Sequence, residues 1–172
     1  GSLLVDTLMY FELWAGVDQL EQFQKRGTYF SYIWDEIDDN IIAQFENAKR
    51  DQVYYEDFEQ SSAGNVVKNG ENARSGDYYL SSGSFTIPSA LFTPEYGVEY
   101  QMSYWYYKAG LGWRWIVTSF NNSITTDGSR IDDIVICPIN TLFTTYTYKP
   151  LIGMTSKTDS NGFSIYYEYD SL

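Results

Sequence analysis

The amino-acid sequence predicts an all-β protein built around a β-sandwich. Three observations predict this fold class: residues that alternate between apolar and polar, abundant aromatic side chains, and short apolar runs separated by Gly, Ser and Asn clusters. Aromatic residues make up 19% of the 172 residues, and such side chains favour the pleated surface of a sheet. A chain of this length forms one medium domain or two small ones and buries a substantial core.

The clearest element is a strand predicted over residues 98–108. The apolar side chains that fall on one of its faces are Val98, Tyr100, Met102, Tyr104 and Tyr106. Successive side chains of a strand point to opposite faces, so we expect this face to be buried in a core. The other face begins polar and ends with Trp105 and Tyr107, which predicts that part of it stays in contact with water.

A second alternating run follows this strand across a short loop. The loop holds Gly110 and Gly112, after which Trp113, Trp115 and Val117 alternate again. Two alternating runs joined by a glycine-containing loop predict a hairpin. This hairpin is too hydrophobic to be stable alone, so we expect the neighbouring sequence to supply a second sheet.

The first flank, residues 1–50, is predicted as strands followed by a linker. Residues 3–26 fit either a helix with one apolar face or short strands, and residues 19–23 alternate, which favours strands. Residues 28–34 are rich in strand-forming residues. Residues 35–40 are acidic but lack the glycine and glutamate spacing of an EF-hand, so we expect a solvated loop.

The remaining chain divides into a sandwich, residues 51–138, and a last segment, residues 139–172. Short apolar runs and turn clusters alternate after residue 53 with the spacing of a β-sandwich, and Pro138 ends its last strand. The last segment is predicted as a β-meander with a hairpin turn at Asn161-Gly162. It is too short to bury its own face, as expected for a slice of a repeat array.

The charge of the chain excludes several classes of partner. The formal net charge is -12, with 11 Lys and Arg against 23 Asp and Glu. A nucleic-acid binder needs a basic surface, so no nucleic-acid partner is expected, and docking on anionic lipid is equally disfavoured. No apolar stretch reaches membrane-spanning length, so we expect no direct membrane insertion. The Gly1-Ser2 start and the abrupt end indicate a piece of a longer protein.

The sequence contains no histidine and a single cysteine, Cys137. This excludes Ser-His-Asp and Cys-His catalysis, His-ligated zinc, an internal disulfide and Cys-cluster metal sites within this chain. Cys137 ends an apolar run, which favours a buried, inert thiol over a reactive one.

The last segment resembles the YD repeats of bacterial RHS-type proteins. The residues that carry the resemblance are Tyr146, Tyr148, Pro150, Gly153, Thr155, Ser156, Thr158, Asp159, Asn161, Gly162, Tyr167, Tyr169 and Asp170. The sequence departs from the repeat at Lys149, where the family usually has Asp. Residues 19–34 and 42–48 are similar to the segment that precedes an inserted module in such proteins, although Trp34-Asp35-Glu36 stands where the family tends to have Trp-Gly-Tyr.

The middle segment resembles jelly-roll carbohydrate-binding or galactose-binding-like modules. The markers are Asp57-Phe58-Glu59, Ala73–Gly76, Tyr104-Trp105 and Ile131-Asp132-Asp133-Ile134. In such modules a Glu of the first strand and an Asp of the last often share a structural calcium ion. The resemblance therefore implies a Ca2+ site at Glu59 and Asp132, with Asp133 as a substitute ligand. The alternative is that these are surface carboxylates beside edge strands.

The two resemblances imply a non-catalytic glycan-binding module within a large secreted or cell-surface RHS-type protein. Sugar rings stack on exposed aromatic faces, and the candidates are Trp105, Tyr107, Trp113 and Trp115. The alternative for these side chains is the hydrophobic core. The alternative function is a purely structural spacer or lid on the YD-repeat shell, without a ligand. Exposure of the aromatic residues in a groove would favour the first function, and burial beneath the flanking strands the second.

The sequence does not favour an enzyme. Glycoside hydrolysis uses a pair of carboxylates, and Asp132 and Asp133 are a candidate pair in this sequence. Adjacent residues of a strand, however, point to opposite faces and cannot flank one bond. No activated nucleophile or base can be named from the sequence.

The two flanks are expected to pair with each other. Neither can cover its own apolar face, and an unpaired edge would favour association with another chain. We therefore predict that the flanks form a single sheet into which the sandwich is inserted, with contacts between residues 29–34 and residues 145–169.

Overall fold

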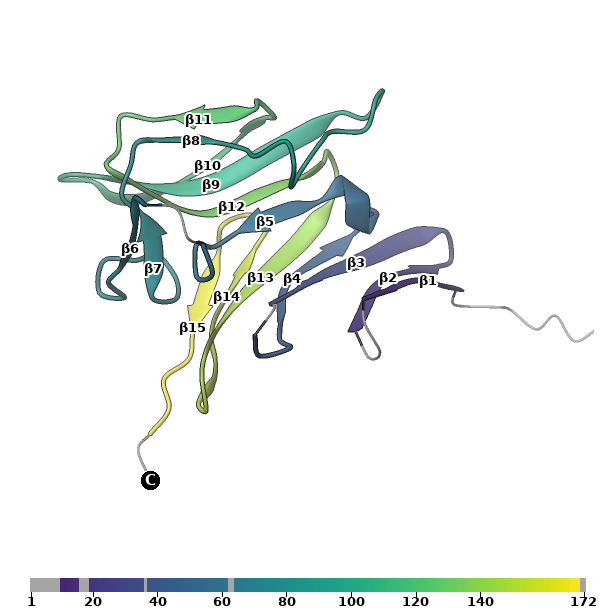
Figure 1. Cartoon of the computed structure of the whole chain (residues 1–172), viewed down its shortest axis with the longest axis horizontal. Helices are drawn as coiled ribbons and strands as arrows, with labels where there is room; N and C mark the ends of the chain where they lie inside the picture. The colour runs from purple at the N-terminus through teal and green to yellow at the C-terminus, as the bar shows by residue number, and fades with distance from the viewer. Residues whose placement is uncertain (1–9, 16–18, 36, 62–63, 171–172) are drawn as a thin grey trace, which may run out of the picture.

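The computed structural model describes residues 10–15, 19–35, 37–61 and 64–170, which fold into three antiparallel sheets (Figure 1). The predicted all-β class is confirmed, and the only helical element of the described residues is the 3-10 turn η1 (Arg50–Gln52). Residues 16–18, part of the stretch predicted as short strands, lie outside the described residues. No helix within these ranges is long and apolar enough to cross a membrane.

The first sheet, here called the flank sheet, contains strands from both flanks in the order β1-β2-β3-β4-β13-β14-β15. Its strands are β1 (Tyr10–Ala15), β2 (Gln19–Lys25), β3 (Thr28–Trp34), β4 (Ile41–Glu46), β13 (Leu142–Lys149), β14 (Gly153–Asp159) and β15 (Ser164–Tyr166). Strands therefore form in residues 19–34, as the alternating pattern predicted.

The other two sheets form the sandwich. The central sheet has the order β10-β9-β12-β7-β6, with β5 also paired to β12, and the outer sheet pairs β11 with β8. Their strands are β5 (Tyr54–Glu56), β6 (Val66–Lys68), β7 (Tyr78–Leu80), β8 (Ser84–Thr86), β9 (Tyr100–Lys108), β10 (Gly112–Ser119), β11 (Ser123–Thr125) and β12 (Arg130–Pro138).

The central sheet is the middle of three layers (Figure 1). One face of β9 places Tyr100, Met102 and Tyr104 in a core that also contains Ile124 of the outer sheet. All four side chains are buried, so the predicted core face of this strand is confirmed.

The opposite face of the central sheet packs on the flank sheet. The second core between them contains Ala43, Phe45, Ala48, Val53, Tyr55, Val135, Cys137 and Phe143. The prediction that part of this face stays in contact with water is wrong for Trp105, which is only 9% exposed because the guanidinium of Arg74 covers its ring. Tyr107, near the end of the strand, is half-buried. Cys137 is buried, and burial raises the pKa of its thiol to about 11, in line with the expected inert thiol.

The sandwich is inserted between two neighbouring strands of the flank sheet. β4 and β13 pair antiparallel, with Phe45 opposite Phe143 and Ala43 opposite Thr145. The predicted pairing of the two flanks is therefore confirmed. The partner strand differs from the expected one: β4 lies between β3 and β13, so residues 29–34 do not pair with the last segment. The cause is that residues 41–46 form a strand of their own before the linker.

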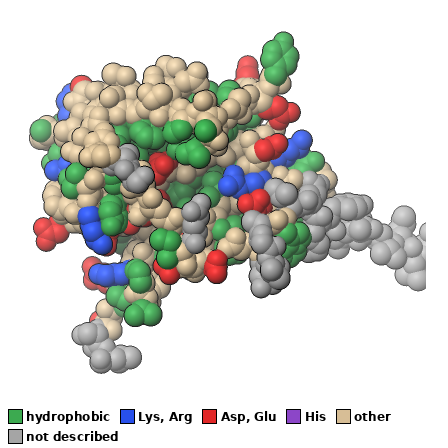
Figure 2. All heavy atoms as spheres, in the orientation of Figure 1, with side chains coloured by type: hydrophobic (Ala, Val, Ile, Leu, Met, Phe, Trp, Pro, Cys, Tyr) green, Lys and Arg blue, Asp and Glu red, His purple; other side chains and the backbone are tan. Residues whose placement is uncertain are grey.

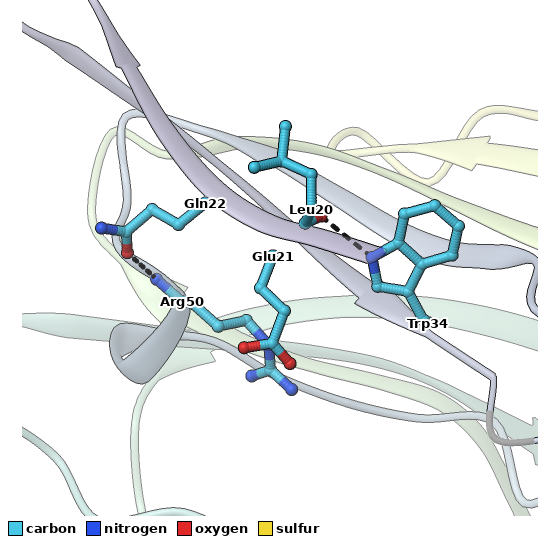
Figure 3. Close-up of polar contacts among 5 residues, drawn as sticks. All are labelled: Leu20, Glu21, Gln22, Trp34 and Arg50. Atoms are coloured by element: carbon cyan, nitrogen blue, oxygen red, sulfur yellow. Dashed lines mark hydrogen bonds and ion pairs between the residues drawn. The ribbon is translucent and has the colours of Figure 1, made fainter. Parts of the chain in front are cut away.

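The crossing from the flank sheet into the sandwich is anchored on β2 (Figure 3). The backbone N–H of Arg50 in η1 donates to Oε1 of Gln22 at 2.7 Å, and the Arg50 side chain lies 4.0 Å from the carboxylate of Glu21. Beside it, the indole N–H of Trp34 donates to the carbonyl of Leu20 at 3.0 Å. The partly exposed ion pair contributes little, so the hydrogen bond to the buried Gln22 is the main anchor.

Candidate functional site

A cleft opens where the central sheet meets β13, β14 and β15. It has a volume of about 790 Å³, and we call it the junction cleft. The side chains that give it its chemistry are Arg74, Asp77, Trp113, Lys149, Tyr166 and Glu168. A concave site of this size, with aromatic walls and a few polar groups, has the dimensions of a small-molecule site, about 300–1,000 Å³.

The β9–β10 pairing sets the four predicted aromatic residues on one face. Trp113 lies opposite Tyr107 and Trp115 opposite Trp105, with ring centroids 5.7 Å and 5.2 Å apart. The structure therefore brings together all four residues named from the sequence. Their surroundings differ, because the flank sheet covers only part of this face.

Trp115 belongs to the interface between the sheets, and Trp105 lies beside it. Trp115 lies 6.5 Å from Phe143 of β13, and a Cβ added at Gly162 would lie 2.6 Å from the Trp115 ring. Trp105 is buried under the guanidinium of Arg74, at 4.0 Å. Both indole N–H groups are buried without a hydrogen-bond partner. Trp115 therefore serves packing, whereas Trp105 lines the junction cleft but is only 9% exposed and offers little surface to a ligand.

Trp113 and Tyr107 lie beyond this interface and are half-buried. The guanidinium of Arg130 covers Tyr107 at 4.4 Å from the ring centroid, whereas Trp113 lines the junction cleft. Of the four predicted aromatic residues, Trp113 is the one best placed to contact a ligand.

Arg74 joins the two walls of the cleft. Its guanidinium lies over Trp105 and 5.4 Å from the ring of Tyr166, and it donates to the hydroxyl of Ser164 at 2.8 Å. Its carbonyl accepts the Tyr166 hydroxyl at 3.1 Å. Stacking on aromatic faces and a hydrogen-bonding fork are properties of Arg that Lys does not share. Sequence reasoning did not single out Arg74 or Tyr166, since no local pattern showed that residues so far apart would meet.

Hydroxyl side chains line the flank-sheet side of the cleft. Thr147 Oγ1 lies 2.6 Å from the Ser156 hydroxyl and 3.0 Å from that of Thr155. Thr158 and Ser164 form a similar pair at 2.8 Å. Cross-strand hydroxyl pairs stabilise an antiparallel sheet and leave a polar surface behind the aromatic walls.

Two of the three carboxylates predicted as metal ligands, Asp132 and Asp133, lie behind the cleft at a bulge of β12. The register of β12 against β9 shifts between Asp132 and Val135, and Asp133 has a φ of 50°. The bulge breaks the alternation assumed from the sequence, so both carboxylates meet residues 74–75. Asp132 Oδ2 accepts the Arg74 backbone N–H at 2.8 Å, and Asp133 accepts the hydroxyls of Tyr55 and Ser75, both at 2.9 Å.

Glu59, the third predicted ligand, contacts the backbone just after residues 74–75. Its Oε1 accepts the backbone N–H groups of Asp77 and Tyr78, both at 2.8 Å. Gly76 has a φ of +60°, and a side chain there would strain the backbone and displace the Glu59 carboxylate, so glycine is favoured. The buried Asp57 accepts the backbone N–H of Glu59 at 3.0 Å.

Burial raises the pKa values of the acidic cluster formed by Asp57, Glu59, Asp132 and Asp133. It raises the pKa of Asp57 to about 8 and that of Glu59 to about 7, against hydrogen bonds from the backbone that act in the opposite direction. Burial likewise raises the pKa of Asp132 and of Asp133. Desolvation disfavours the charged form of a carboxyl group, and each neighbouring carboxylate adds to the effect for Asp57.

The fit of a calcium ion to these residues is incomplete. Each predicted ligand, Glu59, Asp132 and Asp133, already accepts protein hydrogen bonds. Within the described ranges, no three or more His, Cys, Asp or Glu side chains are grouped so that they could hold a metal ion. A site built on Glu59 and Asp132 would need further oxygen ligands. Calcium binding stays a prediction.

The buried carboxylates are separated from the cleft. Asp132 and Asp133 are 0% and 2% exposed, so neither can reach a substrate in the cleft. Comparison with known proteins adds no assignment: no family model, no curated protein and no solved structure matches this chain.

Proposed function

We propose that the chain is a non-catalytic glycan-binding module of a larger, secreted or cell-surface protein of RHS type, and that the glycan binds in the junction cleft. The observation that carries this proposal is the combination of Trp113 and Tyr166 with Asp77 and Glu168 around one cavity. Aromatic faces pack on the C–H groups of a sugar ring, and carboxylates accept hydrogen bonds from its hydroxyl groups.

The surface of the protein supports this class of ligand over nucleic acid or membrane. On the face shown in Figure 2, acidic and basic side chains are interspersed and hydrophobic side chains lie between them. The net charge of -12 disfavours polyanions. A neutral polyol does not need a basic surface.

A glycan array probed with the full chain, followed by calorimetry on the strongest hit, tests the proposal. Trp113→Ala should lower the affinity about ten-fold or more, since aromatic residues dominate most binding sites. Trp14→Ala is the matched control, because Trp14 is 51% exposed in β1 and does not line the cleft. Binding that survives Trp113→Ala, or is lost equally in the control, would contradict the assignment.

A second function, a structural spacer or lid on a YD-repeat shell, is supported by the packing of Trp115. Its ring is covered by Phe143 and the turn at Gly162, as expected if the sandwich is built to dock on the flank sheet. The same array separates the two functions. A chain that binds no glycan but unfolds as one unit with its flanks is a spacer.

A further inference from the structure

We infer that the junction cleft selects uncharged glycans and rejects anionic ones, an inference that rests on the glycan binding proposed above. The deciding features are the side chains that a sugar carboxylate or sulfate would meet. Two cations, Arg74 and Lys149, and two anions, Asp77 and Glu168, line the cleft. Their charges cancel, so selectivity depends on which of them are free to bind.

The guanidinium of Arg74 is only partly available to a ligand, because it is stacked on an aromatic ring and one of its five N–H groups already has a protein partner. It is stacked on Trp105 at 4.0 Å, its Nη2 donates to Ser164 at 2.8 Å, and Tyr166 lies against it at 5.4 Å. A carboxylate or sulfate is bound best by a guanidinium that offers two parallel N–H groups. Turning Nη2 of Arg74 toward an anion would break its hydrogen bond to Ser164, which joins Arg74 to β15.

Lys149 is the remaining cation, and it is exposed. An exposed ammonium is well hydrated and screened by salt, so it contributes little to the binding of an anion. Glu168 is exposed as well, and Asp77 lies 4.0 Å from the ammonium of Lys68. Each of these carboxylates still has oxygen atoms that can accept hydrogen bonds from sugar hydroxyl groups. The cleft is therefore equipped for hydroxyl groups and not for negative charge.

A neighbouring pocket strengthens the rejection of anions. It has a volume of about 210 Å³ and shares Asp77, Thr147 and Tyr148 with the junction cleft. The lining residues that carry a full charge near neutral pH are Asp35, Asp38, Asp77 and Lys68. Asp57 and Glu59 also line this pocket, but burial raises the pKa of Asp57 to about 8 and that of Glu59 to about 7, so they add little negative charge there. We assign no ligand to this pocket. Its negative potential extends into the shared wall and opposes any anion that enters the cleft.

The test is an array that holds neutral gluco-, galacto- and manno-oligosaccharides beside their sulfated or uronic-acid counterparts. At physiological salt, the chain should bind a neutral member about ten-fold or more tightly than its anionic counterpart. Equal or tighter binding of the anionic counterpart overturns the inference while leaving glycan binding intact. Binding to neither class overturns the proposed function itself.

Glu168→Gln provides a matched variant. Glu168 is exposed, so folding should be unaffected, and removal of its charge should weaken neutral binding and reduce the preference for neutral over anionic members. The control is Glu99→Gln, the same chemical change at an exposed residue that does not line the cleft. A preference that is unchanged in Glu168→Gln, or that falls equally in Glu99→Gln, contradicts the inference.

Discussion

Truncation of Phe143 tests whether the sandwich and the flank sheet are one packed unit. Phe143 is 4% exposed, and its ring lies 6.1 Å from Phe45 and 6.5 Å from Trp115. Phe143→Ala should lower the free energy of unfolding by about 3–5 kcal/mol, the usual loss for a Phe truncated in a core. With an unfolding entropy of about 2.1 cal/mol/K per residue, 172 residues give ~0.36 kcal/mol/K, so the Tm should fall by about 8–14 °C.

The assay is denaturant unfolding followed by tryptophan fluorescence, with a thermal scan beside it. Phe163→Ala is the control, because Phe163 is 73% exposed and its truncation should change the free energy of unfolding by no more than about 0.5 kcal/mol. A loss for Phe143→Ala as small as that of the control would refute the packing argument. Two separate unfolding transitions in the unsubstituted chain would refute it equally.

Three further predictions concern the interface and the acidic cluster. Gly162→Ala should cost about 1–3 kcal/mol more than Gly97→Ala in denaturant unfolding, because both have positive φ but only the first meets Trp115. Folding raises the pKa of Asp57 to about 8, so in EDTA the contribution of Asp57 to the free energy of unfolding should be fully present below about pH 4 and be lost as pH rises through about 8. The difference between the unsubstituted chain and Asp57→Asn, measured by denaturant unfolding across this pH range, isolates that contribution. A difference that does not change with pH would exclude Asp57 as its source. If calcium binds at Glu59, millimolar calcium should raise the Tm relative to EDTA, and Glu59→Gln should remove this increase. Equal Tm values of the unsubstituted chain in calcium and in EDTA would contradict calcium binding.

The fold could be predicted from the sequence wherever apolar and polar residues alternate regularly. The uninterrupted pattern of β9 correctly placed Tyr100, Met102 and Tyr104 in a core, and the need to cover two apolar flanks correctly predicted that they pair. Both inferences depend only on local pattern and on the cost of exposed apolar surface. Sequence reasoning missed that β4 would be the strand that joins the flanks, because pairing partners are set by tertiary packing.

The candidate site could be predicted from the sequence less completely than the fold. The sequence named Trp113 but grouped it with Trp105 and Trp115, since alternation shows which side chains share a face and not what covers that face. The β12 bulge at Asp133 was also missed, because a single residue with positive φ leaves no trace in a period-two pattern. Arg74 joins the two walls of the cleft through Ser164 and Tyr166, and these contacts exist only when β15 is placed against the sandwich.

The most direct test of glycan binding in the junction cleft is to follow the indole N–H signals of the five tryptophans by NMR during titration with the strongest array hit. The Trp113 signal should shift on binding, because its ring lines the cleft. The Trp34 signal should stay in place, since its N–H is bonded to the Leu20 carbonyl at 3.0 Å in the flank sheet and lies outside the cleft. A shift of Trp34 with Trp113 unmoved would show that the glycan binds elsewhere and would contradict the proposed site.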